Sequence, residues 1–510
     1  MLKTLSKWLF GLIIFLLILA TAYLVWFING VNTINGADTE LADHAAFASP
    51  IELTAITDVN VLSPDGKTML PNRTVVVDGG KIVSVKSGDT APADAMVING
   101  RGKYIIPGLV DSHTHILKSR NDLLLYVANG VTHIRDLGGP PEHLKLREEI
   151  EQGRVGPRMF VSSPPINSMG LLKGTFFEIM TLFHKTTRSA EHAKKLVKEF
   201  ADQGYDAIKT YHLDMPSYRA VNELAAELGI PTTGHFPLSM ELSELAVTQQ
   251  KEVAHIEEIV RILIREFGSI NEKGSDAFYA HVEARSDDVI DDILANDITV
   301  NSVLWFMESI HDQFSDLEAE LKSVQIEYAN PGRVEGTIDA PGDFKAGWLP
   351  GDNQFEAVSA PSEQEYKEND IYWLAREKAH HILLKAMVRR GVRIIAGTDA
   401  GANLVVPGFS LHDELQSLNL GGMTPTQALA TATINPAQMM NSNAGAIEVG
   451  RRADLLVLDK NPLADINNTR AINTVILNGR VFGRDKLDAM LAAVKKANEN
   501  SRKYNIDEYR

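Results

Sequence analysis

The middle of this chain alternates short apolar runs with amphipathic segments, and this alternation constrains the fold more than any other feature. The apolar runs read as eight strands at residues 109–111, 131–135, 158–161, 206–210, 231–233, 252–254, 298–300 and 392–396. Between two of them, residues 218–228 carry apolar side chains at helical spacing and stop at Gly229. Repeated strand–helix units predict an α/β fold, and eight units favour a (β/α)8 TIM barrel. A doubly wound open sheet is the structural alternative.

The regions on either side of this alternation read as β structure. Residues 74–77 lead through Asp78-Gly79-Gly80-Lys81 into residues 82–85, which predicts a hairpin. The far end repeats the pattern, with a buried-strand run at 453–458 and a turn at Asn478-Gly479 inside residues 475–482. We therefore expect a small β-sandwich domain formed from both flanks of the barrel.

One segment interrupts the alternation, because the seventh and eighth strands are separated by far more residues than a connection needs. We expect an insert at about 305–370, which begins on the barrel face where active sites lie. It is interpreted as a lid or a specificity insert, and a solvated excursion without a role is the alternative. The expected domains are an anchor at 1–30, a tether at 31–49, a first β part at 50–106, the barrel at 107–445, a second β part at 446–484 and a helical C-terminal tail at 485–510.

The N-terminal segment predicts a transmembrane helix. Two lysines precede an uncharged run from Trp8 to Ile28, about the length that crosses the hydrocarbon core of a bilayer. The next charges are acidic, so the positive-inside rule places the N-terminus in the cytoplasm. We expect a membrane-anchored protein whose catalytic domain is extracytoplasmic, and periplasmic in a Gram-negative cell. A cleaved signal peptide and a secreted form are the alternative, since Ala20 and Ala22 offer a small-residue cleavage site.

Charge and cysteine content exclude several classes of function. The net charge of −16 argues against nucleic acid as a partner, because a polyanion would be repelled. The chain has no cysteine, which rules out disulfides, thiolate metal sites and a cysteine nucleophile. Any metal must therefore be held by histidine, carboxylate or modified lysine. We expect a small-molecule or short-peptide substrate, and whether the chain forms a homo-oligomer is left open.

Six candidate ligand residues stand at the ends of predicted strands. His113 and His115 have i, i+2 spacing, which in extended backbone sends both side chains to one face. The other four, each directly after an apolar run, are Lys209, His235, His255 and Asp399. In a barrel, the C-terminal strand ends share one rim, so these residues predict a metal site there.

Each of these residues has an ordinary structural alternative when taken alone. A lysine at a strand end can extend its amine to solvent, and a single histidine can be a satisfied core or surface residue. Asp399 could simply cap the next helix. Only the joint pattern favours a metal site.

Three segments resemble the amidohydrolase superfamily, and the resemblance covers nearly everything after the tether. Residues 106–115 (Ile-Pro-Gly-Leu-Val-Asp-Ser-His-Thr-His) resemble its first-strand motif, residues 396–401 (Ala-Gly-Thr-Asp-Ala-Gly) its eighth-strand motif, and residues 450–459 its closing β segment. Residues 131–139 and Ile208-Lys209 are similar to the metal-dependent Xaa-Pro dipeptidase (prolidase-like) and imidazolonepropionase-related group.

That resemblance implies a binuclear metal centre and assigns its ligands. His113, His115 and Asp399 would hold one divalent ion, His235 and His255 the other, and Lys209 would bridge them as a CO2-derived carbamate. Zinc suits these ligands best, while manganese and cobalt would also be held.

The same resemblance implies hydrolysis by a metal-activated hydroxide, with Asp399 as general base and then general acid. The hydroxyl of Tyr211 could donate to the developing oxyanion, with packing under the insert as the alternative. Arg135, His212 and His412 are weaker candidates for contact with the substrate or with a ligand.

The leading hypothesis is cleavage of an amide or peptide bond in a dipeptide or an N-acyl amino acid. The insert puts the usual dipeptide preference in doubt, and hydrolysis of a cyclic amide, lactone or phosphotriester is the alternative. A catalytically silent, membrane-tethered binding or scaffold barrel is the alternative of another class.

Overall fold

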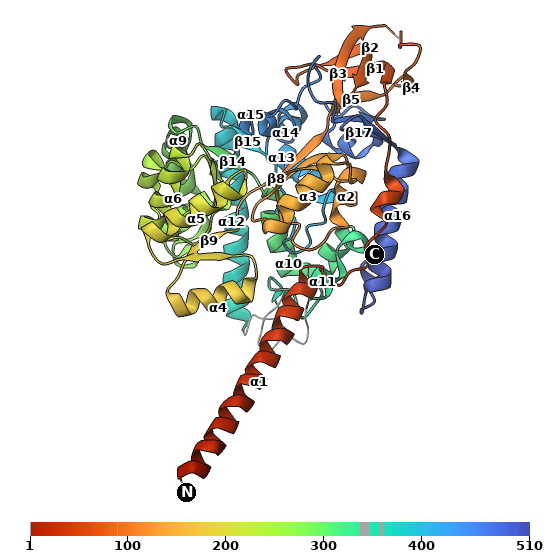
Figure 1. Ribbon diagram of the computed structural model, residues 1–510. Coiled ribbons are helices and arrows are strands. Elements are labelled where there is room, and N and C mark those ends of the chain that lie inside the picture. Colours follow the sequence, from red (N-terminus) through yellow and green to blue (C-terminus); the bar gives the residue numbers. More distant parts are fainter. Residues whose placement is uncertain (1, 89, 337–345, 358–361) are drawn as a thin grey trace.

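The body of the molecule is a parallel barrel surrounded by helices, with a small sheet on one side (Figure 1). The computed structural model describes residues 2–88, 90–336, 346–357 and 362–510. The barrel strands are β6 (Leu109–Thr114), β7 (Val131–Asp136), β8 (Arg158–Val161), β11 (Ile208–Thr210), β12 (Thr232–Gly234), β13 (Glu252–Val253), β14 (Thr299–Asn301) and β15 (Ile394–Ile395). These are the eight runs predicted as strands, and the predicted TIM-like α/β barrel is confirmed.

Two seams close the barrel. At one seam, the Ser163 amide donates to the Ala207 carbonyl at 2.9 Å, which joins β8 to β11. At the other, the Ser112 amide donates to the Ala396 carbonyl at 2.9 Å and the Asp399 amide donates to the His113 carbonyl at 2.8 Å. The first and eighth strands are therefore adjacent, which brings their C-terminal residues together.

Helices cover the outside of the barrel because the strands are buried on both faces. The helix predicted at 218–228 is α6, which begins at Met215 behind an Asp214 cap. The surrounding helices are α2 (Asp122–Ala128), α3 (Pro141–Glu151), α5 (Ala190–Gln203), α6 (Met215–Glu227), α7 (Glu257–Phe267), α8 (Ile270–Lys273), α9 (Ser275–Ala295), α12 (Glu363–Arg390), α13 (Phe409–Leu420), α14 (Pro425–Thr431) and α15 (Ile434–Met439).

A strand–helix–strand excursion at the C-terminal rim had no counterpart in the sequence prediction. It consists of β9 (Ile166–Ser168), α4 (Leu171–Thr181) and β10 (Lys185–Thr187), and β9 pairs in parallel with β10 and β11. Gly174 lets α4 approach β10 closely, because a Cβ there would lie 2.6 Å from the Thr186 hydroxyl. The excursion extends the barrel wall beyond the end of the third strand.

The small sheet combines strands from both flanks of the barrel. Its members are β1 (Thr54–Leu62), β2 (Met69–Asp78), β3 (Lys81–Ser87), β4 (Met96–Asn99), β5 (Tyr104–Pro107), β16 (Leu455–Leu458), β17 (Ile472–Leu477) and β18 (Arg480–Gly483). The two predicted hairpin turns join β2 to β3 and β17 to β18. Antiparallel pairing of β5 with β16 joins the two flanks, and α16 (Arg484–Ser501) follows the last strand.

The described part of the insert is largely helical, with turns over most of residues 346–357. It contains α10 (Leu304–Ser323) and α11 (Pro331–Glu335), while residues 337–345 and 358–361 lie outside the described residues. Arg333 of α11 is buried and donates to the carbonyls of His115 and Gly401. The insert therefore reaches the C-terminal ends of the first and eighth strands.

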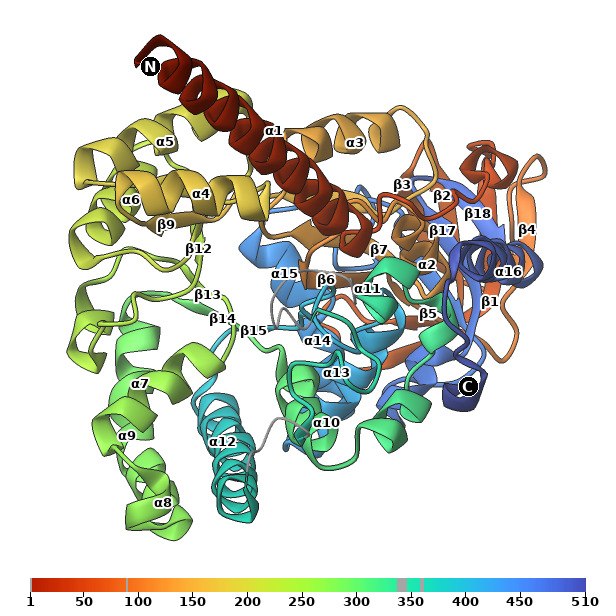
Figure 2. The same ribbon diagram turned by 90° about the horizontal axis from the view of Figure 1, so that it is seen from below.

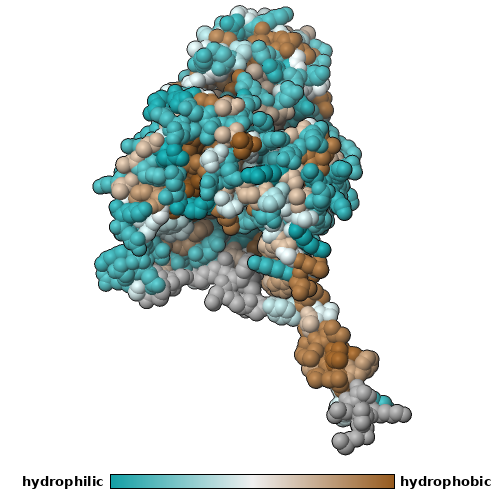
Figure 3. Space-filling view, turned by 90° about the vertical axis from the view of Figure 1, so that its left-hand side faces the viewer, coloured by the Kyte–Doolittle hydropathy of each residue, from teal (hydrophilic) through white to brown (hydrophobic). Residues whose placement is uncertain are grey.

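Helix α1 (Leu2–Ile34) leads away from the body on the side opposite to the small sheet (Figure 1). Within the described chain, it is the one helix whose length and hydropathy would suit a bilayer span, over Lys7–Ile34. Its surface is hydrophobic while the body above it is largely hydrophilic (Figure 3). The helix continues four residues past the anchor limit predicted at residue 30, and the Lys118 amide then donates to the Asn35 carbonyl at 3.0 Å. The chain after α1 thus lies against the barrel rim.

Candidate metal centre

The six predicted ligand residues all lie at the C-terminal ends of barrel strands. His113 is in β6 and His115 directly follows it, while Lys209 is the central residue of β11. His235 follows β12, His255 lies two residues after β13, and Asp399 lies four residues after β15. Because parallel strands end at the same rim, residues spread over nearly 290 positions of sequence meet in one place.

Asp399 lies between the two histidines of the first strand. Its Oδ1 atom is 3.1 Å from His115 Nε2 and 3.4 Å from His113 Nε2. One candidate ligand atom from each of the three residues lies within 4.8 Å of the others. The arrangement suits one divalent cation, because two imidazole nitrogens and a carboxylate oxygen converge.

The second group consists of His235, His255 and Glu258, which also offer atoms within 4.8 Å of one another. Glu258 is fully engaged with protein, however, since it binds His235 Nδ1 at 2.8 Å, the Phe236 amide at 2.8 Å and the Arg261 guanidinium at 2.7 Å. We therefore assign it to holding the His235 ring rather than to a cation. That leaves His235 and His255 as the free imidazoles of this group.

Contacts between histidine rings join the two groups. The His113 and His255 rings stack at 5.7 Å between centroids, and the His235 and His255 rings are 4.9 Å apart. The distances place the two candidate ligand sets side by side on one rim of the barrel, as a binuclear centre requires.

Hydrogen bonds on the far ring nitrogens orient two of these histidines. His113 Nδ1 is 3.1 Å from the Ala254 carbonyl, and His235 Nδ1 is bound by Glu258. Each bond keeps the proton on Nδ1 and leaves Nε2 as the lone-pair atom that faces the site. His255 Nδ1, by contrast, is buried and has no hydrogen-bond partner among the described residues.

Lys209 is buried, and its Nζ atom has no hydrogen-bond partner in the described part of the chain. Burial lowers the pKa of the amine to about 8, against the opposing influence of Asp399 and Glu252. At neutral pH, a far larger fraction of this amine is uncharged than in an exposed lysine. An uncharged, unpaired amine beside the two histidine groups is chemically able to react.

Asp399 is held as an anion by its surroundings. Burial by itself raises the pKa of this carboxyl, but the nearby His113, His115 and His255 outweigh it and bring the pKa well below its usual range. Its backbone φ is 58°, a left-handed conformation that aspartate tolerates better than most residues. The carboxylate is therefore ionised throughout the physiological range and turned toward the histidines.

Tyr211 and His212 lie beside the second group. The Tyr211 ring is 4.3 Å from the His235 ring, and the His212 ring is 6.1 Å from it. Burial raises the pKa of Tyr211 to about 12, so its hydroxyl stays protonated and can donate a hydrogen bond. His184 contacts Tyr211 at 5.3 Å and is bound by Asn167 at 2.9 Å.

Two of the weaker candidates occupy structural positions. Arg135 is buried inside the barrel, where it forms a two-bond ion pair with Glu252. His412 is hydrogen-bonded through both ring nitrogens, to the Thr469 hydroxyl at 2.9 Å and to the Asn129 carbonyl at 3.0 Å. Because these partners lie outside the ligand groups, His412 is not a contact for substrate or ligand, which corrects that expectation.

Three residues of this region were missed from the sequence. Glu258 stands three positions after His255, at the start of α7, a spacing that could have suggested a helical partner. His184 lies in the α4 excursion, and Arg333 lies in the insert. Both reach the site only through tertiary contacts. No local pattern distinguishes them.

Residues 358–482 match the model of the amidohydrolase family. An imidazolonepropionase from Brevibacillus brevis is 24% identical over 410 residues, covering 76% of this chain and 83% of the relative. An ochratoxinase from Aspergillus niger is 32% identical over 123 residues, covering 23% of this chain and 25% of the relative.

Solved structures share the fold. The bottromycin amidohydrolase matches with a TM-score of 0.66 at 19% identity, covering 92% of this chain and 96% of its own. A putative prolidase from Bifidobacterium longum matches with a TM-score of 0.55 at 22% identity, covering 87% and 99%.

Proposed function

Because this chain belongs to the amidohydrolase superfamily, we propose that it is a metal-dependent hydrolase that cleaves an amide or peptide bond in a small substrate. A dipeptide or an N-acyl amino acid would suit such a site. The observation that carries the proposal is the meeting of four histidines, Lys209 and Asp399 on one rim of the barrel.

The residues present fit two divalent cations. His113, His115 and Asp399 would hold one, and His235 and His255 the other, with zinc the best match to imidazole and carboxylate. Lys209 fits a carbamate bridge, because its buried amine has no hydrogen-bond partner among the residues that the structure describes. The neutral amine would attack CO2, form an N–C bond and release one proton, which yields an anion with two oxygens.

Two divalent cations at this place would acidify a water molecule and polarise the scissile carbonyl. The carboxylate of Asp399 takes the proton from the attacking water and returns it to the departing nitrogen. The Tyr211 hydroxyl, protonated at neutral pH, donates to the oxygen on which negative charge develops. Glu258 keeps His235 in place throughout.

The relatives support hydrolysis of a carbon–nitrogen bond. Those found by sequence include imidazolonepropionases, and the structural neighbours include a Xaa-Pro dipeptidase and a prolidase. For location, we propose that α1 crosses a membrane and that the catalytic body lies outside the cytoplasm. The apolar surface and the length of α1 support that placement.

The direct test is a substrate screen of the metal-reconstituted protein, with elemental analysis of the same sample. Dipeptides and N-acyl amino acids should be hydrolysed, whereas activity confined to lactones or phosphotriesters would assign the site to the alternative chemistry. A fully metallated protein that hydrolyses none of these compounds would indicate a silent binding barrel.

Lys209→Ala tests the bridge. The variant should lose most metal and turnover, and short carboxylic acids should restore part of both, because they can supply the missing anion. Lys251→Ala is the control, since the Lys251 amine donates to the Asn296 carbonyl on an exposed part of the barrel. Full metal content in Lys209→Ala would refute the carbamate.

A further inference from the structure

Helix α4 has an apolar face that points away from the protein. Leu172 is 86% exposed, Phe176 60% and Leu171 53%, and Ile179 and Leu182 continue the same side of the helix. The opposite side is polar or buried, since Gly174 packs on Thr186 and the Glu178 carboxylate accepts from the Thr186 amide and hydroxyl. A helix of this kind normally turns its apolar face inward, so the outward face indicates a partner.

Helix α1 packs against α4, and both lie on the same side of the body (Figure 2). The chain leaves α1 at the catalytic rim, because Asn35 is bound by Lys118, three residues after His115. A membrane crossed by α1 would therefore face the open end of the barrel.

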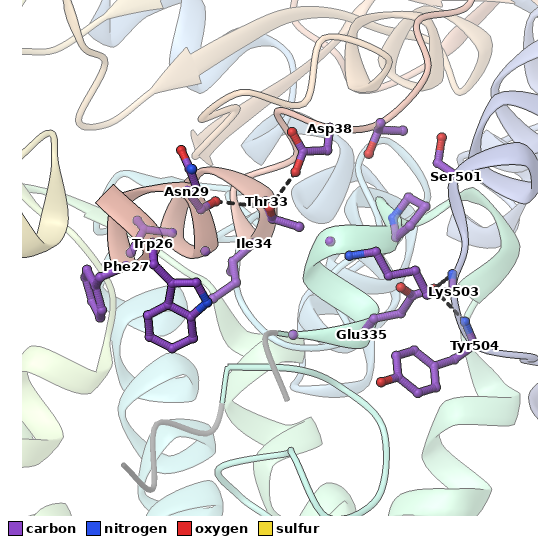
Figure 4. A pocket seen from close by; sticks show the side chains of 16 residues that line it. Trp26, Phe27, Asn29, Thr33, Ile34, Asp38, Glu335, Ser501, Lys503 and Tyr504 are labelled. Atoms are coloured by element: carbon purple, nitrogen blue, oxygen red, sulfur yellow. Dashed lines mark hydrogen bonds between the residues drawn. The ribbon is translucent and has the colours of Figure 1, made fainter. Parts of the chain in front are cut away.

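Helix α1 ends six residues, or about 9 Å, past Ile28, so the body lies close to a membrane that this helix crosses. The uncharged run from Trp8 to Ile28 is only about as long as a hydrocarbon core, at about 1.5 Å per residue. Trp26 lies where α1 meets the body, around a pocket of about 290 Å³ that is also lined by Lys503 and Tyr504 (Figure 4). Tryptophan, tyrosine and lysine are typical of the level where hydrocarbon meets water. Helix α4 packs against α1 on this side of the body.

A second pocket lies beside the end of α4 and the segment that follows His115. It has a volume of about 410 Å³ and is lined by Asn35 after α1, by Ile116 and Leu117 next to His115, and by Leu182 and Phe183 at the end of α4. The volume lies within the range of sites for small ligands. His184, the next residue, contacts Tyr211 at 5.3 Å between ring centroids, and the Tyr211 ring is 4.3 Å from the His235 ring.

We propose that the apolar face of α4 lies in the surface of the bilayer crossed by α1, and that the enzyme hydrolyses amides of long-chain acids. The acyl chain would pass from the bilayer into the pocket beside Leu182, which places the amide at the metal centre. This substrate class rests on the proposed hydrolase function; the membrane contact of α4 does not.

The membrane contact can be measured without activity. Because the chain has no cysteine, Leu172→Cys places a single fluorescent label on full-length protein in phosphatidylcholine vesicles. Lipids that carry a nitroxide near the headgroup should quench this label strongly. Leu420→Cys is the matched control, since Leu420 is 74% exposed at the far end of α13, and its label should stay bright.

Equal quenching at both positions would overturn the contact. A label at Leu172 that is shielded from water but not quenched by lipid would assign the face to a protein partner or a second copy, and would also overturn it.

The substrate class is tested with N-acetyl and N-dodecanoyl derivatives of one amino acid. The full chain in vesicles should prefer the dodecanoyl compound by about tenfold or more in kcat/KM, because apolar burial favours the longer chain. Leu182→Asp should remove this preference, whereas Leu420→Asp should keep it.

No preference for the long chain would overturn the substrate class even if Leu172 is quenched. Failure to hydrolyse either compound, with Leu172 still quenched, would instead count against the proposed hydrolase function.

Discussion

Lys209 occupies a position that costs free energy unless the side chain has a chemical role. A buried, unpaired ammonium is disfavoured, and burial accordingly lowers the pKa of this amine to about 8. For Asp399, the influence of the neighbours on the pKa outweighs that of burial, since three histidines keep its carboxylate ionised. The surroundings of these two side chains, rather than their intrinsic pKa values, thus make Asp399 a base and the Lys209 amine reactive.

Asp399→Asn should keep the fold and most of the metal while kcat falls by about 10²- to 10⁴-fold, the usual contribution of a general base. The amide retains one oxygen for a cation but cannot accept a proton from water. Steady-state kinetics and elemental analysis on one sample measure both quantities. Asp459→Asn, in the small sheet domain, is the control, and turnover near the normal rate in Asp399→Asn would remove this residue as the base.

Tyr211→Phe should lower kcat by about a hundredfold with little change in KM, because a donor to the developing oxyanion acts mainly in the transition state. Tyr218→Phe controls for the loss of a buried hydroxyl. Tyr218 lies on α6, and its hydroxyl bonds to the Thr248 hydroxyl at 2.8 Å. A change confined to thermal stability would instead show that Tyr211 has only a packing role.

At the scale of elements, the strand ends and the helices that follow them contribute differently to the metal centre. The strands supply the candidate ligands, and the next helix or loop fixes their orientation, as α7 does when Glu258 binds His235. Gly234 shows how tightly these strands approach: its φ is 129°, and a Cβ there would lie 2.1 Å from the Thr210 carbonyl oxygen. Any side chain at that position would displace His235.

Glu258→Gln should weaken metal binding by about 10- to 100-fold, the usual effect of losing a partner that orients a histidine ligand. Metal titration monitored by calorimetry measures this directly. Glu266→Gln on the same helix is the control, because Glu266 forms an exposed ion pair with Arg285. Unchanged affinity in Glu258→Gln would show that the His235 ring is held by packing alone.

The same carboxylate affects acid stability. Burial raises the pKa of Glu258, but His235, His255 and Arg261 outweigh it and lower the pKa to about 2. The stabilisation is therefore complete above the unfolded value of about 4.3 and is lost as the pH falls toward 2.

At the scale of the molecule, the two ends of the chain have different structural roles. The C-terminal end completes the small sheet through β16–β18 and adds α16, so it is part of the folded body. Helix α1 projects from that body, and residues 35–42 after it are fastened to the catalytic rim, as when the Ala42 amide donates to Asn121 at 3.0 Å. Removal of α1 alone should therefore leave the body intact.

Deletion of residues 1–30 should release the protein from membranes and leave hydrolysis of short substrates within about twofold of the full chain, because distant sites act independently. Ultracentrifugation without detergent, circular dichroism and kinetics on an N-acetyl substrate measure the outcome. A deletion variant that fails to fold would show that α1 is part of the core.

The sequence by itself determined the barrel, the hairpins of the small domain and the six candidate ligand positions. Those features depend on local periodicity, turn residues and the rule that parallel strands end on one rim. The tertiary structure alone decided that Glu258 orients His235, that His412 bonds to Thr469 and Asn129, and that His184 and Arg333 reach the metal centre. These are contacts between residues distant along the chain, and no local pattern specifies which distant side chains will meet.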